Sequence, residues 1–181
     1  MLKFALLGFL NFGPMTGYDL KQCLEMSTMF FWQAPQSQIY RTLNELEKGG
    51  DIVSHIEAQQ DRPDRRVYEI TEQGKAAFDG WLAEPIQEIS LHKDRLLLKV
   101  FFSGSVDRQA LAAQLQFQKQ LHVRQGRVYT QDIRSFVDQM IDQYPQLIEN
   151  GVVWEATLRF GELYTQMYIQ WLEETIAKLD Q

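Results

Sequence analysis

The feature that most restricts the fold is a short interruption in an otherwise helical sequence. Ile52, Ser54 and Ile56 alternate with Val53, His55 and Glu57 in a strand-like pattern, and residues 67–70 form a second run of strand length. The polar segment 59–64 between them contains Pro63 and is typical of a turn. These runs predict one small β-hairpin within a mainly α-helical chain.

Three helical segments precede the hairpin. Residues 2–10 predict a short apolar helix that ends at a turn-forming segment. Thr16 is expected to cap a second helix, with Asp19 three positions later as its capping-box partner. Pro35 suits the first turn of a third helix, which two glycines stop. The residues of this third helix expected to face the core are Ile39, Leu43 and Leu46.

The order of elements in the first ninety residues is therefore helix, helix, helix, hairpin, helix. The fourth helix is expected to begin at Thr71 and to end before Pro85. A helix-turn-helix module places its second helix in the major groove of DNA, and an added hairpin makes it a winged helix. We predict a winged helix-turn-helix domain over residues 1–85.

The second half of the chain carries long amphipathic patterns instead. Helices are expected over residues 91–103, from about 106 to 143 with Gly126 inside it, and from about 151 to 179. Such helices need a partner surface, and a symmetric dimer supplies one. We predict a helical dimerisation domain over residues 90–181. The apolar stripe expected to hold the two copies together is Val153, Phe160, Leu163, Met167 and Trp171.

Composition limits the chemistry of the chain. The net charge is −6, and the first ninety residues hold 8 basic and 13 acidic residues, so any DNA contact depends on where the basic residues lie. The single Cys23 excludes an internal disulfide and a Cys-rich zinc site, and we expect a buried, inert thiol in a reducing cytoplasm. The sequence shows no catalytic arrangement, no spacing of metal ligands and no membrane-spanning stretch. We expect no enzyme activity, no metal, no cofactor and no membrane partner.

Several short motifs lie in order along the chain, beginning with 17–20 (GYDL) and with 37–43 (SQIYRTL) followed by Leu46-Glu47 and Gly50. The first resembles the second-helix motif of the PadR family of bacterial regulators, and the second is similar to the recognition helix of that family. Residues 62–74 look like its wing and the start of the next helix, which Trp81-Leu82 completes. Residues 94–102 (DRLLLKVFF) resemble the C-terminal domain of the virulence-activator-alpha type. The resemblance implies a transcriptional regulator, usually a repressor and sometimes an activator, that dimerises through long C-terminal helices.

One position departs from the family pattern. The family usually has an apolar residue directly after the glycine that ends the recognition helix, whereas Asp51 stands there in this chain. We expect this change to loosen the corner between the third helix and the wing.

The side of the third helix away from the core is the predicted contact with DNA. Asparagine and glutamine pair with adenine edges, and arginine pairs with guanine. The candidate residues are Gln36, Ser37, Tyr40, Arg41 and Asn44. The alternative for this face is simple exposure to solvent, and Tyr40 could instead be half-buried against the second helix.

Basic residues outside the third helix are candidates for phosphate contact. Arg62, Arg65 and Arg66 cluster at the wing, and Lys21 lies on the second helix. The alternative interpretation of the wing is a turn whose arginines neutralise neighbouring aspartates.

Aromatic residues crowd the last helix. Trp154, Tyr164 and Tyr168 could line a pocket for a small aromatic effector, because aromatic walls at an interface form apolar sites. The alternative is ordinary packing in a helical interface.

The predicted function is sequence-specific binding of double-stranded DNA by a homodimer on a pseudo-palindromic operator, with repression as the result. The acidic balance of the first half motivates a rival, a winged-helix module that binds protein instead of DNA. A second rival is an enzyme whose site is assembled across the dimer.

Overall fold

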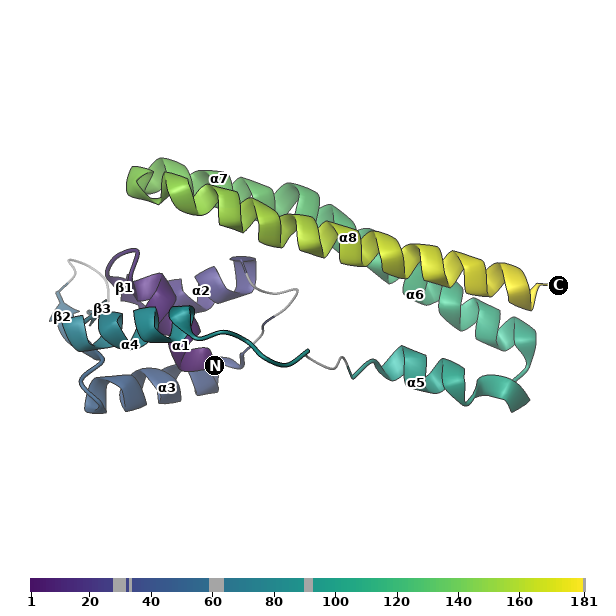
Figure 1. Cartoon of the computed structure of the whole chain (residues 1–181), viewed down its shortest axis with the longest axis horizontal. Helices are drawn as coiled ribbons and strands as arrows, with labels where there is room; N and C mark the ends of the chain where they lie inside the picture. The colour runs from purple at the N-terminus through teal and green to yellow at the C-terminus, as the bar shows by residue number, and fades with distance from the viewer. Residues whose placement is uncertain (28–31, 33, 59–63, 90–92, 181) are drawn as a thin grey trace. The chain divides into compact units, whose positions relative to one another are not determined.

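The structure is a computed structural model that divides the chain into two compact units, Met1–Gln87 and Glu88–Gln181 (Figure 1). The residues that it does not describe are 28–31, 33, 59–63, 90–92 and 181. Helices dominate, and one small sheet lies in the first unit, which confirms the predicted fold class. Among the described helices, none has both the length and the apolar character needed to cross a bilayer.

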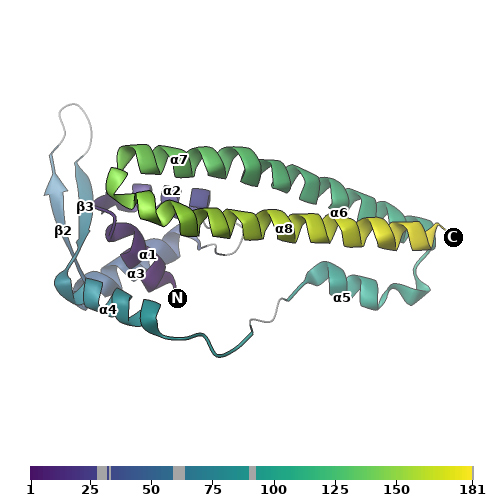
Figure 2. The same cartoon turned by 45° about the horizontal axis from the view of Figure 1, so that its top comes forward.

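In its described residues, the first unit combines four helices with a three-stranded antiparallel sheet. Its elements are α1 (Leu2–Leu10), β1 (Met15–Thr16), α2 (Gly17–Ser27), α3 (Gln36–Lys48), β2 (Ile52–Glu57), β3 (Arg65–Ile70) and α4 (Glu72–Ala83). The strand order is β1-β3-β2. Figure 2 shows the hairpin of β2 and β3, which is paired from Ile52 opposite Ile70 to Glu57 opposite Arg65.

Among the described strands, β1 was not predicted from the sequence. Met15 pairs with Tyr68 and Thr16 pairs with Val67, on the side of β3 away from β2. Two residues are too few to show an alternating pattern, so a strand of this length is recognised only from its partner.

The core of the first unit fixes the orientation of α3. Ile39, Leu43 and Leu46 are buried, as predicted, with 1%, 0% and 3% of their surfaces exposed. The helix contacts both α1 and α2, whose buried leucines complete this core. Since one side of α3 is committed to the core, the opposite side faces outward.

Both predicted helix caps are present. The N–H of Thr16 donates to Asp19 Oδ2 at 3.0 Å, and the N–H of Asp19 donates to Thr16 Oγ1 at 3.1 Å. At the start of α4, Thr71 Oγ1 accepts from the N–H of Gly74 at 3.1 Å. These bonds satisfy backbone donors that have no partner inside the helices.

The corner between α3 and β2 is closed by backbone contacts, so the loosening expected at Asp51 is not seen. The N–H of Asp51 donates to the carbonyl of Leu46, and its own carbonyl accepts from the N–H of Thr71, each at 3.0 Å. Gly50 makes the turn with a φ of 79°, a conformation that favours glycine. A Cβ on Gly74 would lie 2.1 Å from the Asp51 oxygen, so this close approach requires glycine.

The second unit is built from helices. They are α5 (Arg95–Phe101), α6 (Arg108–Val128), α7 (Arg134–Gln143) and α8 (Ile148–Leu179), with one π-helical turn, Tyr129–Ile133, between α6 and α7. Helix α8 runs back alongside α6 and α7 (Figures 1 and 2). The core of this unit is formed by Leu111, Leu115, Tyr168, Leu172 and Ile176, with Leu96 and Val100 of α5 packed against it.

Two of these helices begin at other residues than expected. Helix α5 begins at Arg95 because the carboxylate of Asp94 caps it, accepting from the N–H groups of Leu96 and Leu97 at 2.7 and 2.9 Å. The two residues before Lys93 in the expected helix, 91 and 92, lie outside the described residues. Helix α8 begins at Ile148 and continues through Gly151, where a Cβ would meet Ile141 of α7 at 3.1 Å. Gly151 was expected to mark the start of this helix, but it lies inside α8, where it allows α8 to pack closely on α7.

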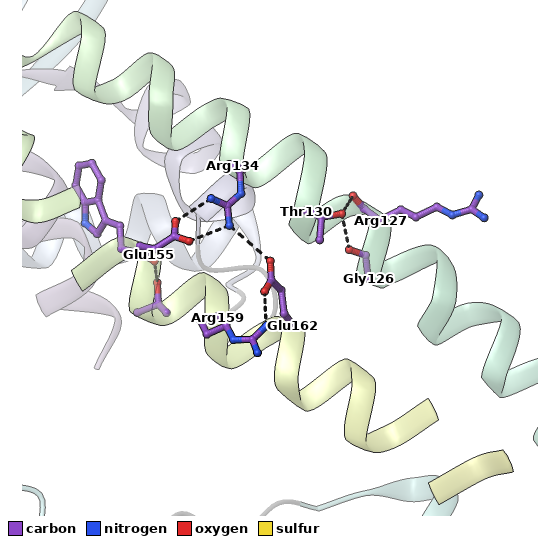
Figure 3. Close-up of polar contacts among 9 residues, drawn as sticks. Gly126, Arg127, Thr130, Arg134, Glu155, Arg159 and Glu162 are labelled. Atoms are coloured by element: carbon purple, nitrogen blue, oxygen red, sulfur yellow. Dashed lines mark hydrogen bonds and ion pairs between the residues drawn. The ribbon is translucent and has the colours of Figure 1, made fainter. Parts of the chain in front are cut away.

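The π-helical turn interrupts the long helix predicted over 106–143. The hydroxyl of Thr130 bonds to the carbonyls of Gly126 and Arg127, both at 3.2 Å, and competes there with the backbone donors (Figure 3). Beyond this turn, Arg134 pairs with Glu155 at 2.9 Å and with Glu162 at 3.6 Å, which fastens α7 to α8. The hydroxyl of Thr130, which competes for backbone carbonyls, and the ion pairs of Arg134 between α7 and α8 thus accompany the π-helical turn.

Candidate functional site

The outward side of α3 carries the five residues predicted to contact DNA, and all five are exposed. Tyr40 is partly covered, with 38% of its surface exposed, and its ring lies against Gly17 at the start of α2. A Cβ on Gly17 would come within 2.5 Å of the Tyr40 ring. Tyr40 therefore packs on the second helix and also reaches the surface, which combines the two interpretations left open by the sequence.

A hollow of about 580 Å³ lies beside this face. It is lined by Thr16, Gly17, Tyr18, Asp19, Tyr40, Asn44, Arg65, Arg66 and Tyr68. The hollow therefore brings together the start of the second helix, the third helix and two of the predicted wing arginines. The third wing arginine, Arg62, lies outside the described residues.

Each basic residue predicted to contact DNA and described by the structure is paired with a glutamate. Two pairs lie within one helix, Lys21 with Glu25 at 3.3 Å and Arg41 with Glu45 at 3.8 Å. In the hairpin, Arg65 pairs with Glu57 at 2.7 Å, directly across the two strands. Arg66 pairs with Glu47 of α3 at 2.6 Å. The excess of acidic residues in the first half of the chain counted against DNA binding. Four of these acidic residues are the direct ion-pair partners of the candidate basic residues.

The pair of Arg66 and Glu47 includes a third side chain. Ser54 Oγ of β2 donates to Glu47 Oε1 at 2.5 Å and accepts from Arg66 Nε at 2.8 Å. The hydrogen bond from Ser54, with the bond and charge of Arg66, holds the pKa of Glu47 below its ordinary value. Arg66 also lies over the ring of Tyr68, with its guanidinium carbon 5.3 Å from the ring centroid.

Neither the thiol of Cys23 nor a cluster of metal ligands offers a reactive site among the described residues. Cys23 is buried, and burial, followed by the charge of Asp19, raises the pKa of its thiol to about 11, so it carries no reactive thiolate. Within the part of the chain that the structure describes, no three His, Cys, Asp or Glu side chains gather as metal ligands would.

The predicted dimerisation stripe is largely exposed on α8. Val153, Phe160, Leu163 and Met167 show between 48% and 59% of their surfaces. Trp171 is different, because it packs against the core of its own unit and meets the ring of Tyr168 edge-on at 5.4 Å. The four exposed members therefore form an apolar surface that the single chain leaves uncovered.

Sequence reasoning missed a second exposed apolar group, on and after α5. Phe101 and Phe102 show 79% and 70% of their surfaces and pack edge-on against each other at 5.0 Å. Their outward position was not predicted because Leu96 and Val100, the α5 residues that pack against the core, are partly buried, and the neighbouring apolar residues hide the period of 3.6.

A cavity of about 880 Å³ in the second unit includes two of the three predicted pocket residues. Tyr164 and Tyr168 line it, whereas Trp154 does not. The other lining residues are Lys93, Asp94, Arg95, Leu96, Lys99, Ala113, Gln114, Phe117, Gln118 and His122. The cavity thus joins α5, α6 and α8, and its lining is more polar than the aromatic pocket predicted from α8 alone.

The floor of this cavity is a group of interacting titratable side chains. The Tyr168 hydroxyl donates to Asp94 Oδ2 at 2.5 Å, and His122 stacks on the Tyr168 ring with 4.0 Å between centroids. Burial and then the bond to Asp94 raise the pKa of Tyr168. Burial also lowers the pKa of His122, against the charge of Asp94, and His122 Nδ1 is buried without a hydrogen-bond partner among the described residues. The hydrogen-bonding capacity of this nitrogen is thus not used by the described residues.

Comparison with protein families assigns both halves of the chain. Residues 6–80 match the model of the transcriptional regulator PadR-like family, and residues 92–180 match the virulence activator alpha C-terminal model. A curated relative, the negative transcriptional regulator PadR of Bacillus subtilis, is 30% identical over 99% of this chain and 98% of its own length.

Solved structures of that regulator have the same fold. The Bacillus subtilis PadR complex with operator DNA superposes with a TM-score of 0.81 at 25% identity, over 98% of each chain. Its complex with p-coumaric acid gives a TM-score of 0.72 at 24% identity, over 99% of each chain.

Proposed function

The chain belongs to the PadR-like family of transcriptional regulators, and we propose that it binds an operator as a homodimer and represses transcription there. The observation that carries the DNA-binding site is the shared surface of α3 and the hairpin. The exposed side of α3, the hollow beside it and the arginines of β3 lie together on one unit. A related regulator has been crystallised on operator DNA, which supports this use of the surface.

In this proposal α3 enters the major groove and reads bases through its polar side chains. Arg41, with 73% of its side chain exposed, is suited to guanine, and Gln36 and Asn44 are suited to adenine. Ser37, Lys21 and the wing arginines Arg62, Arg65 and Arg66 would contact the backbone or the minor groove. Tyr40, fixed against Gly17, would hold the start of α2 next to the same stretch of DNA.

Arg41→Ala tests this assignment by gel shift on operator DNA obtained by selection from random sequences. We expect operator binding to be lost while the protein stays dimeric. Arg159→Ala, on α8 of the other unit, is the matched control and should bind as the wild type does. Equal binding by both variants would remove Arg41 from the interface, and binding of a protein partner in place of DNA would favour the rival function.

The dimer would form through the exposed apolar residues of α8. The single chain leaves about half of each of Val153, Phe160, Leu163 and Met167 exposed, and a second copy would cover them. Two DNA-binding units around a two-fold axis match a pseudo-palindromic operator. A DNA-binding regulator works where the chromosome lies, so we place the protein in the cytoplasm.

The effector site would be the cavity of the second unit. A relative has been crystallised with p-coumaric acid, a small aromatic acid. In this chain Lys93, Arg95 and Lys99 line the cavity and would attract a carboxylate, while Tyr164 and Tyr168 would contact the ring. Titration of p-coumaric acid should quench the fluorescence of Trp171, which adjoins Tyr168, and should release operator DNA. An unchanged signal and unchanged DNA binding would exclude this acid as the effector.

A further inference from the structure

The side chains of Glu47, Ser54 and Arg66 form a closed ring of hydrogen bonds across three elements. Glu47 lies in the last turn of α3, Ser54 on β2 and Arg66 on β3. Ser54 donates to one carboxylate oxygen of Glu47, and Arg66 donates to the other oxygen and to Ser54. The serine hydroxyl thus acts as donor and acceptor at once, and both oxygens of the carboxylate are engaged.

This ring differs from the other glutamate pairs on the same surface. Lys21–Glu25 and Arg41–Glu45 each stay within one helical turn, and Arg65–Glu57 joins two strands that are already paired by their backbones. Of the four pairs, Glu47–Arg66 is the one that fastens the third helix to the hairpin. It is also less exposed, with 29% of the Glu47 side chain and 44% of the Arg66 side chain accessible.

We propose that Glu47 is a positioning residue that sets the ratio between operator affinity and affinity for other DNA. This inference rests on the proposed function and adds a determinant of specificity to it. By holding Arg66 through the ring, Glu47 fixes the angle between the wing and α3. Both then meet the operator in one prepared arrangement, which lowers the entropy lost on binding.

Non-specific binding depends on a different property of the same carboxylate. Affinity for DNA of any sequence comes mainly from phosphate contacts with basic residues. An arginine that already has a carboxylate at 2.6 Å gains less from a phosphate, and the carboxylate repels the phosphate as well. Glu47 therefore weakens binding to arbitrary sequences while it organises binding to the operator.

Glu47→Gln tests the inference, because glutamine keeps the shape of the side chain and removes its charge. Dissociation constants are measured for operator DNA and for a scrambled duplex of the same length, over a range of salt concentrations. We expect tighter binding to the scrambled duplex. The ratio of the affinity for the operator to the affinity for the scrambled duplex should fall roughly tenfold. The slope of the logarithm of the binding constant against the logarithm of the salt concentration should steepen by about 0.9. This is the value for one additional phosphate contact, made by the released Arg66.

Two further variants separate positioning from the effect of charge alone. Glu57→Gln removes one carboxylate charge from the hairpin and leaves the ring intact, so it should tighten binding to both duplexes in parallel. Ser54→Ala breaks the ring without changing any charge, so it should lower the ratio without steepening the salt slope.

The outcomes distinguish this inference from the proposed function. If the ratio of operator affinity to scrambled-duplex affinity is the same in Glu47→Gln, Glu57→Gln and the wild type, Glu47 is only a surface charge. That result would overturn the inference but would leave the proposed operator binding intact. Selection of no DNA sequence by the wild-type protein would overturn the proposed function and the inference with it. A lowered ratio in Glu47→Gln and in Ser54→Ala, but not in Glu57→Gln, supports the positioning role.

Discussion

The hydroxyl of Tyr168 on α8 donates a hydrogen bond of 2.5 Å to Asp94, the residue that caps α5. The two residues are 74 positions apart in the chain. The same carboxylate holds the first N–H groups of α5 through its other oxygen, so one aspartate links the start of α5 to the core of the second unit.

Tyr168→Phe is therefore expected to loosen α5. A hydrogen bond to a charged acceptor contributes about 1–2 kcal/mol when partly exposed, so the free energy of unfolding should fall by that amount. Urea unfolding measures it. Tyr18→Phe, whose side chain is exposed in the other unit, is the control and should change little. An unaltered stability in Tyr168→Phe would show that the bond does not anchor the helix.

The penalty of Tyr168→Phe should depend on pH. Burial favours a higher pKa for Asp94, but the bonds from Tyr168 and from the N–H groups of Leu97 and Leu96 hold it below the ordinary 3.8. A lowered pKa contributes stability above the ordinary value and loses it as the pH falls through the folded value. The difference between wild type and Tyr168→Phe should therefore be full at pH 7 and shrink below pH 3.8. The same difference at both values would contradict this account.

Gly17→Ala should disturb the face of α3 through Tyr40. The added Cβ would lie 2.5 Å from the Tyr40 ring, so the ring must move. Overpacking of this kind costs about 1–3 kcal/mol, and the displaced ring should weaken operator binding by roughly tenfold. Gly80→Ala is the control, because nothing lies within 4 Å of its Cβ position in α4. It should bind normally and be about 1 kcal/mol more stable.

Phe160→Glu should separate the dimer. Phe160 shows 59% of its surface in the single chain, and a carboxylate there would be buried without a partner in the proposed interface. Sedimentation equilibrium should show a dimer dissociation constant raised at least about tenfold. Gln166→Glu adds the same charge at an exposed polar position of α8 and should leave the dimer intact. A dimer retained in Phe160→Glu would place the interface elsewhere.

Short-range features of this fold could be read from the sequence. The caps at Thr16 and Thr71 each use a partner three residues away, so their pattern is visible in a few residues. The hairpin likewise shows as two runs of strand length with a polar, proline-containing segment between them. The buried side of α3 follows from a helical period, which also determines the five residues left facing outward.

Long-range contacts could not be predicted in this way. The bond between Asp94 and Tyr168 and the ring of Glu47, Ser54 and Arg66 join residues whose proximity depends on the packing of whole elements. Trp171 continues the apolar stripe in the sequence but turns toward its own core, because α8 packs on α6 through the neighbouring face. Periodicity identifies apolar faces but does not say which partner covers each one.

The central claim is that two copies of this chain read DNA through the outward face of α3. Selection of random duplexes by the wild-type protein, followed by binding and sedimentation of the enriched sequence at two salt concentrations, tests it most directly. The account predicts a pseudo-palindrome bound by two protomers, with half-sites about 34 Å apart and affinity that falls steeply with salt. Failure to enrich any sequence, or binding that is equal for all sequences, would contradict it.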